Sequence, residues 1–156
     1  MNMQINDIET TEPNFVAFRA AEQDYCVGIM DVREIRRWTE TTTLPGSPDY
    51  ITGVINLRGA VVPIIDFSRR LGLETDAPSE RNVIVIVQIG ERICGLLVDE
   101  VSEILRISET HVQKTRSIGP SVEGAIVTGV IVLEERMIRM IDLDRIYGQG
   151  SEDQIQ

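Results

Sequence analysis

Short β-prone segments separated by turn residues dominate the hydrophobic pattern of the chain. Their spacing is typical of strands in an antiparallel all-β fold. Between them, Gly, Pro, Asp and Asn supply the backbone conformations that tight turns need. We expect little helix beyond capped turns at strand ends and residues 48–51. The predicted strands cover residues 15–19, 25–35 with an internal bend, 53–57, 60–65, 83–89, 93–98, 101–105, 127–133 and 137–141.

The segment 83–87, VIVIV, departs from the alternating pattern of a strand with one solvated face. Its residues are apolar at both parities, which predicts a strand covered on both sides. We expect this strand to hold two parts of the molecule together.

The chain carries an internal repeat. GVINLRGAVVPIID, which begins at Gly53, is echoed by GVIVLEERMIRMID, which begins at Gly129. The repeat predicts two small antiparallel barrels, each closed so that few strand edges stay bare. Further matched pairs are Gly28/Gly95 and, after a two-residue insertion, Val32/Val101, Glu34/Glu103 and Ile35/Ile104.

Each copy ends with an aspartate that leads into a possible helical turn. Asp66 and Asp142 both have an arginine three residues later and a glycine six residues later. This spacing favours helix capping by the aspartate. A shared-proton pair of aspartates is the alternative, but Phe67 and Leu143 follow where such a pair needs a polar loop.

Composition and charge exclude several classes of protein. The 156 residues are 42% hydrophobic, enough for one globular domain with a sizeable core. The net charge of −10 and the 4% aromatic content argue against binding to nucleic acid. No apolar run approaches the roughly 20 residues of a membrane span, and residues 1–14 lack the pattern of a secretory signal. We expect a cytoplasmic protein with Cys26 and Cys94 buried and reduced.

Candidate catalytic chemistry is sparse. His111 is the only histidine and Lys114 the only lysine, so neither a histidine-based metal cluster nor a Ser-His-Asp arrangement can be assembled beyond one member. Glycine-rich phosphate-binding motifs are missing as well. We therefore expect a protein that is not an enzyme and that has no catalytic residue, metal site or cofactor.

Charged residues within apolar strand sequence are the remaining unusual feature. Glu34 lies in the segment VREIR, and Arg58 lies at the turn between two predicted strands. A solvated strand face or an intramolecular pair explains them without any partner. With Val32 and Ile35 exposed beside them, they would instead form a docking patch with apolar anchors and charged flanks.

The sequence resembles the CheW family of bacterial chemotaxis scaffold proteins. The resemblance rests on YCVGIMDVREIRR, LPGSPDYITGVINLRGAVVPIIDFSRRLG and GLLVDEVSEIL. It implies an all-β fold of two intertwined, SH3-like, five-stranded β-barrels with short helical turns. It also implies a non-enzymatic adaptor between the cytoplasmic tips of methyl-accepting chemoreceptors and the regulatory domain of the histidine kinase CheA. Such a protein would be cytoplasmic, without membrane insertion or nucleic-acid binding, and recruited to receptor arrays at the inner face of the membrane.

The resemblance also implies a domain division. We expect a disordered lead-in over residues 1–13, one CheW-like domain over 14–148 and a flexible tail over 149–156. Within the domain, the sequence repeat suggests subdomains of about 14–80 and 81–148.

Particular residues acquire expected roles from the resemblance. Glu34, Ile35 and Arg58 fall where the family contacts receptors, and Val32 is an addition to this set. The groove between the subdomains, formed in part by residues 83–87, would take the apolar side of a receptor helix. A related protein that controls pili or a second messenger could use the same residues.

The second copy departs from the family pattern at its turn and in its last strand. Glu134-Glu135 replaces a small or Gly-containing turn, and Arg139 stands where the family tends to have an aliphatic residue. Because Arg139 aligns with Pro63 of the first copy, we expect an edge or outward position there.

Overall fold

The computed structural model describes residues 14–114 and 122–147. The lead-in and tail expected at 1–13 and 149–156 lie outside the described residues. Over the described ranges the chain is built mainly of strands, as the hydrophobic pattern predicts. The strands are β1 (Asn14–Ala20), β2 (Gln23–Gly28), β3 (Val32–Arg37), β4 (Ile51–Leu57), β5 (Ala60–Asp66), β6 (Val83–Ile89), β7 (Arg92–Val98), β8 (Glu100–Arg106), β9 (Val112–Lys114), β10 (Val127–Leu133) and β11 (Arg136–Ile141).

Short helical segments fill the connections between strands. Two are 3-10 turns, η1 (Ile29–Asp31) and η2 (Glu109–His111). Three are α-helices of at most five residues, α2 (Phe67–Arg70), α3 (Val122–Ile126) and α4 (Leu143–Ile146). The helix considered for 48–51 is instead a turn closed by the Ile51 amide donating to the Pro48 carbonyl. The pattern did not anticipate β9 or α3.

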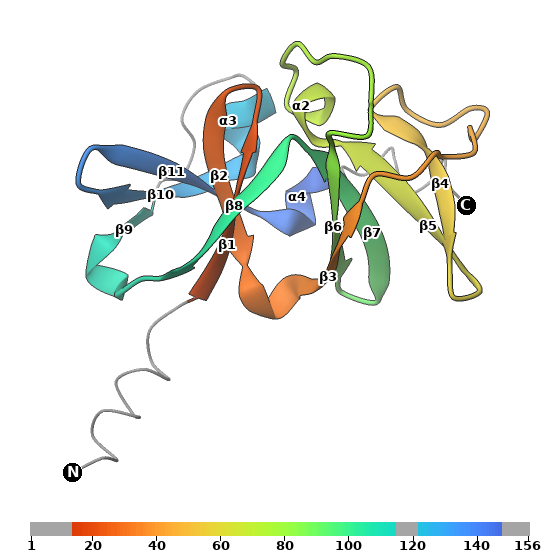
Figure 1. The fold of residues 1–156 in the computed structure, drawn as a ribbon. Coiled ribbons are helices and arrows are strands. Elements are labelled where there is room, and N and C mark those ends of the chain that lie inside the picture. Colours follow the sequence, from red (N-terminus) through yellow and green to blue (C-terminus); the bar gives the residue numbers. More distant parts are fainter. Residues whose placement is uncertain (1–13, 115–121, 148–156) are drawn as a thin grey trace.

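The strands form two sheets that exchange elements between the sequence halves. The six-stranded sheet has the order β8-β1-β2-β11-β10-β9, and the five-stranded sheet has the order β3-β6-β7-β5-β4. Hairpin β1–β2 therefore lies among strands of the second half, and hairpin β6–β7 lies among strands of the first (Figure 1). The predicted all-β fold of two intertwined small barrels is confirmed, with β9 as a sixth strand in one of them. The boundary near residue 80 marks the sequence repeat and does not separate the two sheets.

The two sheets are equivalent strand by strand. Glu34 pairs with Ile86, and Glu103 pairs with Ala17. Glu103 lies 69 residues after Glu34, and Ala17 lies 69 residues before Ile86, so the same shift relates the two strand pairs. Both strand pairs also contain a bulge at the same place, just after Val32 and Val101. An internal duplication explains this match.

The alignment of Gly28 with Gly95 is wrong. Gly95 pairs with Ile64 on the neighbouring parallel strand, and its structural counterpart is Cys26, which pairs with Met140. The shift of 69 residues thus holds through both hairpins without an insertion. A glycine was aligned with a glycine because the sequence alone does not show which strand each one faces.

Three buried clusters explain how the sheets pack. One cluster lies inside the six-stranded sheet and includes Phe15, Ile131 and Ile138. Another lies inside the five-stranded sheet and includes Ile55, Val62 and Ile64. The largest draws side chains from both sheets and joins them. The molecule is consequently two barrels with one shared core between them.

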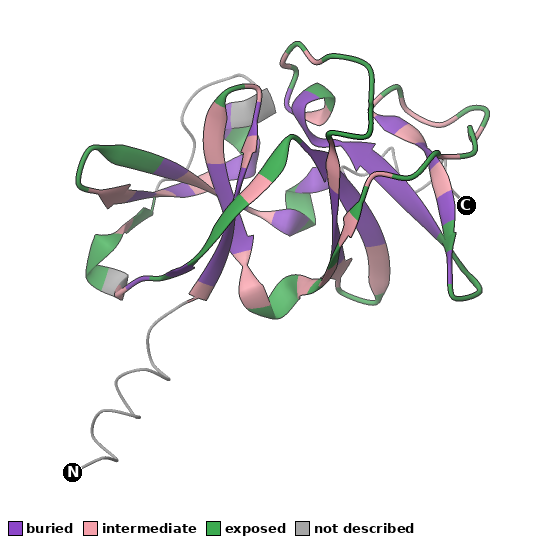
Figure 2. Ribbon diagram, viewed as in Figure 1, coloured by how far each residue is buried: buried purple, intermediate pink, exposed green. Residues whose placement is uncertain are grey.

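Strand β6 belongs to two of these clusters at once. Ile84 and Ile86 point into the five-stranded barrel, whereas Val85 and Val87 point into the shared core. All four side chains are buried, as the central part of β6 shows (Figure 2). The prediction of a strand covered on both faces is confirmed.

An aromatic group in the shared core links the two sheets. Phe67, which follows β5, meets Phe18 of β1 and Tyr25 of β2 edge-on, with ring centroids 4.9 Å apart in both cases. All three rings are fully buried. Such pairs add about 0.5–1.5 kcal/mol each beyond the burial of their apolar area.

The two aspartates at the strand ends cap helices. Asp66 accepts a hydrogen bond from the Arg69 amide at 3.2 Å, and Asp142 accepts one from the Asp144 amide at 3.0 Å. The capping prediction is confirmed. Of the edge or outward position expected at Pro63, the outward alternative is wrong, because Pro63 is buried, and the edge alternative holds. Pro63 is tolerated because β5 pairs with β7 only from Ile64 onward, so no ladder partner needs its missing N–H.

Candidate functional site

Strand β3 lies at one end of the five-stranded sheet and has two different faces. Glu34 and Arg36 pair with Ile86 and Ile84, whose side chains point into the barrel. Ile35 pairs with Val85, whose side chain points into the core between the sheets. Because directly opposed residues share a face of a sheet, β3 carries Glu34 and Arg36 on its barrel side and Ile35 with Arg37 on its other side.

Glu34 forms the centre of a small charged cluster, here called the Glu34 cluster, with Arg36 and Arg58. Its carboxylate accepts hydrogen bonds from Arg58 at the β4–β5 turn and from Arg36 on its own strand, the latter at 3.3 Å. β3 and β4 are the two ends of the sheet order. The Glu34–Arg58 pair therefore ties β3 to the β4–β5 hairpin and helps to close the barrel.

The electrostatics of the Glu34 cluster favour the charged carboxylate. The hydrogen bond from Arg58, helped by the one from Arg36 and by the positive charge of both, lowers the pKa of Glu34 below its usual value. Arg36 and Arg58 share this single carboxylate, so the cluster retains a positive charge. Arg58 stays 71% exposed in spite of the pair, which leaves most of its guanidinium accessible.

The four predicted docking residues do not form one continuous patch. Glu34 and Arg58 come together, as the alternative of an intramolecular pair requires. Ile35 is 45% exposed on the opposite face of β3. Val32 is half-buried against the shared core. The charged pair and the apolar anchor thus occupy adjacent positions on one edge strand but face different directions.

The expectation of a groove lined by residues 83–87 is not met. The side chains of Ile84 to Val87 are buried and Val83 is half-buried, so β6 offers little surface to a helix. The apolar side chain accessible beside β6 is Ile35 on β3. An open hollow lies elsewhere, lined in part by residues 72–77 and 81–82, and most of its lining residues are polar.

The other barrel contains a related ion pair. Glu103 of β8, the counterpart of Glu34, binds Arg136 of β11 at 2.6 Å. Ile104, the counterpart of Ile35, is 63% exposed. The position equivalent to Arg58 is Glu134, so the arginine has moved two residues along the hairpin. Each duplicated barrel keeps a glutamate–arginine closure and an exposed isoleucine.

The sequence did not predict two of the residue contacts in these clusters. Arg36 binds Glu34, and the two-residue spacing in VREIRR could have revealed it, since residues i and i+2 share a strand face. The Glu103–Arg136 pair was not predicted because the repeat aligns Arg58 with Glu134 and not with an arginine. The repeat predicts the position of a closure and not which residue provides it.

Other candidate groups have structural roles. Burial raises the pKa of the Cys26 and Cys94 thiols to about 12, which makes both inert. His111 is exposed. Within residues 14–114 and 122–147, no group of His, Cys, Asp and Glu side chains could hold a metal ion. Among the same residues, no helix has the length and apolar character to cross a membrane.

Comparisons with known proteins point to one family. The model of the CheW-like domain matches residues 14–150. The chain is 48% identical over 132 residues to the chemotaxis protein CheW of Rhizobium meliloti, covering 85% of each protein. It is 41% identical over 149 residues to a probable chemotaxis protein CheW of Rhizobium etli, covering 96% of each.

A solved structure supports the same relationship. The crystal structure of the scaffolding protein TtCheW from Thermoanaerobacter tengcongensis matches with a TM-score of 0.83 and 31% sequence identity. The match covers 90% of this chain and 96% of that one. The duplicated barrels, their exchanged hairpins and these matches over nearly the whole described chain lead to one conclusion: the chain belongs to the CheW family of chemotaxis proteins.

Proposed function

We propose that the chain is a non-enzymatic adaptor that couples chemoreceptors to the histidine kinase CheA. The observation that carries the proposal is the match of the CheW-like domain to residues 14–150. It is supported by the structure itself, in which titratable groups cap helices, close barrels or lie buried as inert thiols. Recruitment to the inner face of the membrane would then follow from receptor binding.

The receptor contact is proposed for the β3 edge. Ile35 supplies an exposed aliphatic anchor, and the Glu34–Arg58 pair fixes the hairpin beside it. Val32 supports β3 from the shared core and does not itself present much surface. The regulatory domain of CheA would bind elsewhere on the barrels, so that both partners are held at once. Simultaneous weak contacts within an array raise the effective concentration of each partner.

Reconstitution tests the proposal directly. We expect this chain to change the kinase activity of CheA in the presence of a receptor cytoplasmic fragment, and to bind each partner separately. If the chain binds neither the fragment nor the regulatory domain of CheA at micromolar concentrations, the proposal fails.

Charge exchange tests the role of the Glu34 cluster. We expect Glu34→Lys or Arg58→Glu to weaken receptor coupling in a folded protein, because each leaves like charges facing one another. Glu103→Lys is the matched control, since it breaks the equivalent closure in the other barrel. If the Glu34→Lys/Arg58→Glu double variant recovers coupling, the pair acts by holding the hairpin. Normal coupling in both single variants would contradict the assignment.

A further inference from the structure

The β3 edge is a basic surface on an acidic protein. The chain has a net charge of −10. Strand β3 and the β4–β5 turn nevertheless bring together four arginines and one glutamate, a formal charge of +3. The equivalent positions on β8 and the β10–β11 turn hold Ser102, Glu103, Leu105, Arg106 and Glu134, a formal charge of −1. Duplication has kept the framework of the two surfaces and reversed their charge.

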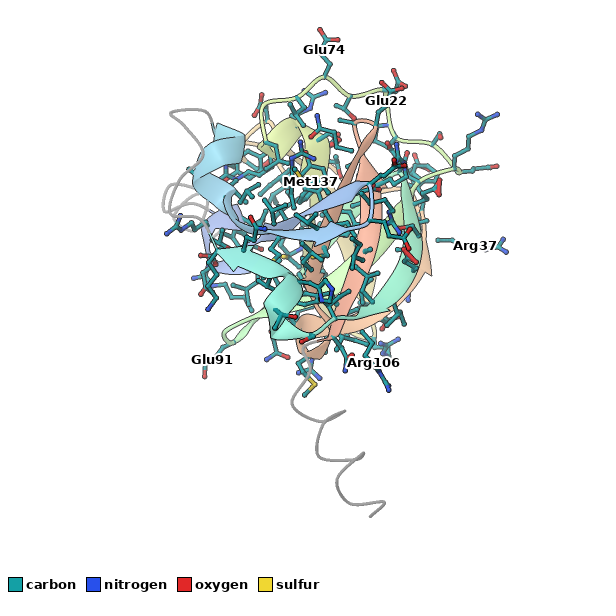
Figure 3. The ribbon with its side chains drawn as sticks, turned by 90° about the vertical axis from the view of Figure 1, so that its left-hand side faces the viewer. Glu22, Arg37, Glu74, Glu91, Arg106 and Met137 are labelled. Carbon is teal, nitrogen blue, oxygen red and sulfur yellow. The ribbon has the colours of Figure 1, made fainter. Side chains whose placement is uncertain are left out.

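Exposed residues alternate along β3. Arg33, Ile35 and Arg37 are all exposed, with Ile35 in the middle. Arg33 donates a hydrogen bond to the neutral side-chain amide of Gln88, which leaves its charge unbalanced. Arg37 has no ion pair with any residue that the structure describes, and its side chain projects away from the ribbon (Figure 3). Two positive charges therefore flank one aliphatic side chain.

Arg58, paired with Glu34 on the barrel side of β3, adds to the positive charge of this edge. Glu34 orients its guanidinium while leaving it mostly exposed. An arginine held in this way loses less side-chain freedom when it binds a second carboxylate. Because Arg36 already competes for Glu34, an incoming carboxylate would balance the excess charge of the cluster.

We propose that the β3 edge docks a receptor helix that carries carboxylates on both sides of an aliphatic residue, with Arg33 and Arg37 binding the carboxylates and Ile35 the aliphatic side chain. This inference rests on the proposed function and specifies the chemistry of its receptor contact. Charge complementarity selects the occupant, since an aliphatic anchor alone would accept any apolar segment.

The spacing along β3 defines the helix that fits. Arg33 and Arg37 lie four residues apart, about 13 Å along a strand at roughly 3.3 Å per residue. A helix rises about 1.5 Å per residue, so about 13 Å corresponds to roughly nine residues. Carboxylates about eight residues apart, which lie on one face of a helix, come closest to this spacing. The aliphatic residue would lie near the middle, about four residues from the first carboxylate.

The test measures binding of the full chain to a purified chemoreceptor cytoplasmic fragment over a range of salt concentrations. Because screening weakens exposed charge pairs, we expect affinity to fall about tenfold between roughly 50 mM and 500 mM NaCl. Arg37→Glu should weaken binding about fivefold to tenfold at low salt and remove most of the salt dependence. Its matched control is Arg106→Glu at the equivalent position of β8, which should change binding less than about twofold.

Thermal unfolding of each variant checks that it stays folded. Reversing single helix carboxylates of the receptor fragment to lysine should recover binding to Arg37→Glu at one position. Binding that ignores salt, equal losses from Arg37→Glu and Arg106→Glu, or no recovery from any reversed carboxylate would overturn the inference while leaving the adaptor function intact. Failure of the wild-type chain to bind the fragment at any salt concentration would overturn both.

Discussion

The two barrels share one plan and differ in how they use it. Both pair an edge strand with an exchanged hairpin, both bulge at the same place and both end in an aspartate-capped helix. They differ inside, because one barrel has Gly95 at the position where the other has Cys26. They also differ at the hairpin tip, where one barrel has Arg58 and the other has Glu134 at the equivalent position. Duplication thus fixes backbone pairing, while side chains facing solvent and the barrel interiors are free to diverge.

The largest expected difference concerns the first residue of each capped helix. Phe67 is fully buried in the aromatic group between the sheets, whereas its counterpart Leu143 is 8% exposed. We expect Phe67→Ala to lower the free energy of unfolding by about 4 kcal/mol and Leu143→Ala by about 2–3 kcal/mol. Urea unfolding of both variants measures the difference. Equal losses would mean that Phe67 does not join the sheets more strongly than Leu143 does.

The barrel interiors provide the second comparison. A Cβ at Gly95 would lie 2.6 Å from Ile64 Cδ1 and 2.8 Å from Ile84 Cγ2, so Gly95→Cys should cost about 1–3 kcal/mol through overpacking. In the other barrel Cys26 has the smaller Ala17 beside it in place of Ile86.

A double variant sharpens this comparison. Adding Ile86→Ala to Gly95→Cys should give neighbouring side chains room to move, so that the double variant loses less stability than the sum of the single losses. Denaturant titration of the two single variants and the double variant completes the cycle. Simple additivity would show that the two barrels accommodate Cys26 and Gly95 independently of their neighbours.

The capping aspartates differ in their surroundings. Asp66→Ala and Asp142→Ala should each cost about 1 kcal/mol through loss of the cap. Asp66 is 3% exposed, and burial raises the pKa of its carboxyl, an effect only partly offset by the hydrogen bond from the Arg69 amide.

The raised pKa of Asp66 predicts a dependence on pH. Because the folded protein holds the proton of Asp66 more tightly than the unfolded chain does, protonation favours folding. Relative to wild type, we expect Asp66→Asn to have a higher free energy of unfolding at neutral pH than at acidic pH. This advantage should shrink as the pH falls through the raised pKa toward 3.8, the ordinary value of the carboxyl. Unfolding measured at several pH values checks the slope, and an advantage that grows on acidification would contradict the account.

The hairpin tips offer the smallest effect. Arg58 and Glu134 both have φ of +52°, a conformation that costs a residue with a Cβ about 1 kcal/mol. Glu134→Gly should therefore raise stability by up to about 1 kcal/mol. Arg58→Gly should raise it less, because it also removes the bond to Glu34. Thermal unfolding ranks the two variants, and a larger gain from Arg58→Gly would show that the Glu34 pair contributes nothing.

Much of this architecture could be predicted from the sequence because hydrophobic periodicity and turn residues report local structure. The repeat beginning at Gly53 and Gly129, the caps at Asp66 and Asp142 and the doubly covered β6 all follow from local patterns. The exchange of hairpins does not, because it depends on which distant strands pair. The error at Gly28 and Gly95 has the same origin.

In the candidate site, too, some features could be predicted from the sequence and others could not. The sequence singled out Glu34 and Arg58 as charges in apolar surroundings, and the structure brings them together. It did not indicate that Ile35 faces the other way, because the bulge after Val32 shifts the alternation of β3. The expected groove at 83–87 failed because apolar strand sequence indicates burial, and buried side chains cannot also line an open surface.

The central claim is that the β3 edge, and not its duplicated counterpart on β8, faces the receptor. The most direct measurement compares the binding of Ile35→Asp and Ile104→Asp to a chemoreceptor cytoplasmic fragment, since both isoleucines are exposed on equivalent strands. The account predicts that Ile35→Asp weakens binding at least about tenfold, the loss of one buried aliphatic anchor. Ile104→Asp should bind as the wild type does. Equal binding by the two variants, or a greater loss from Ile104→Asp, would contradict it.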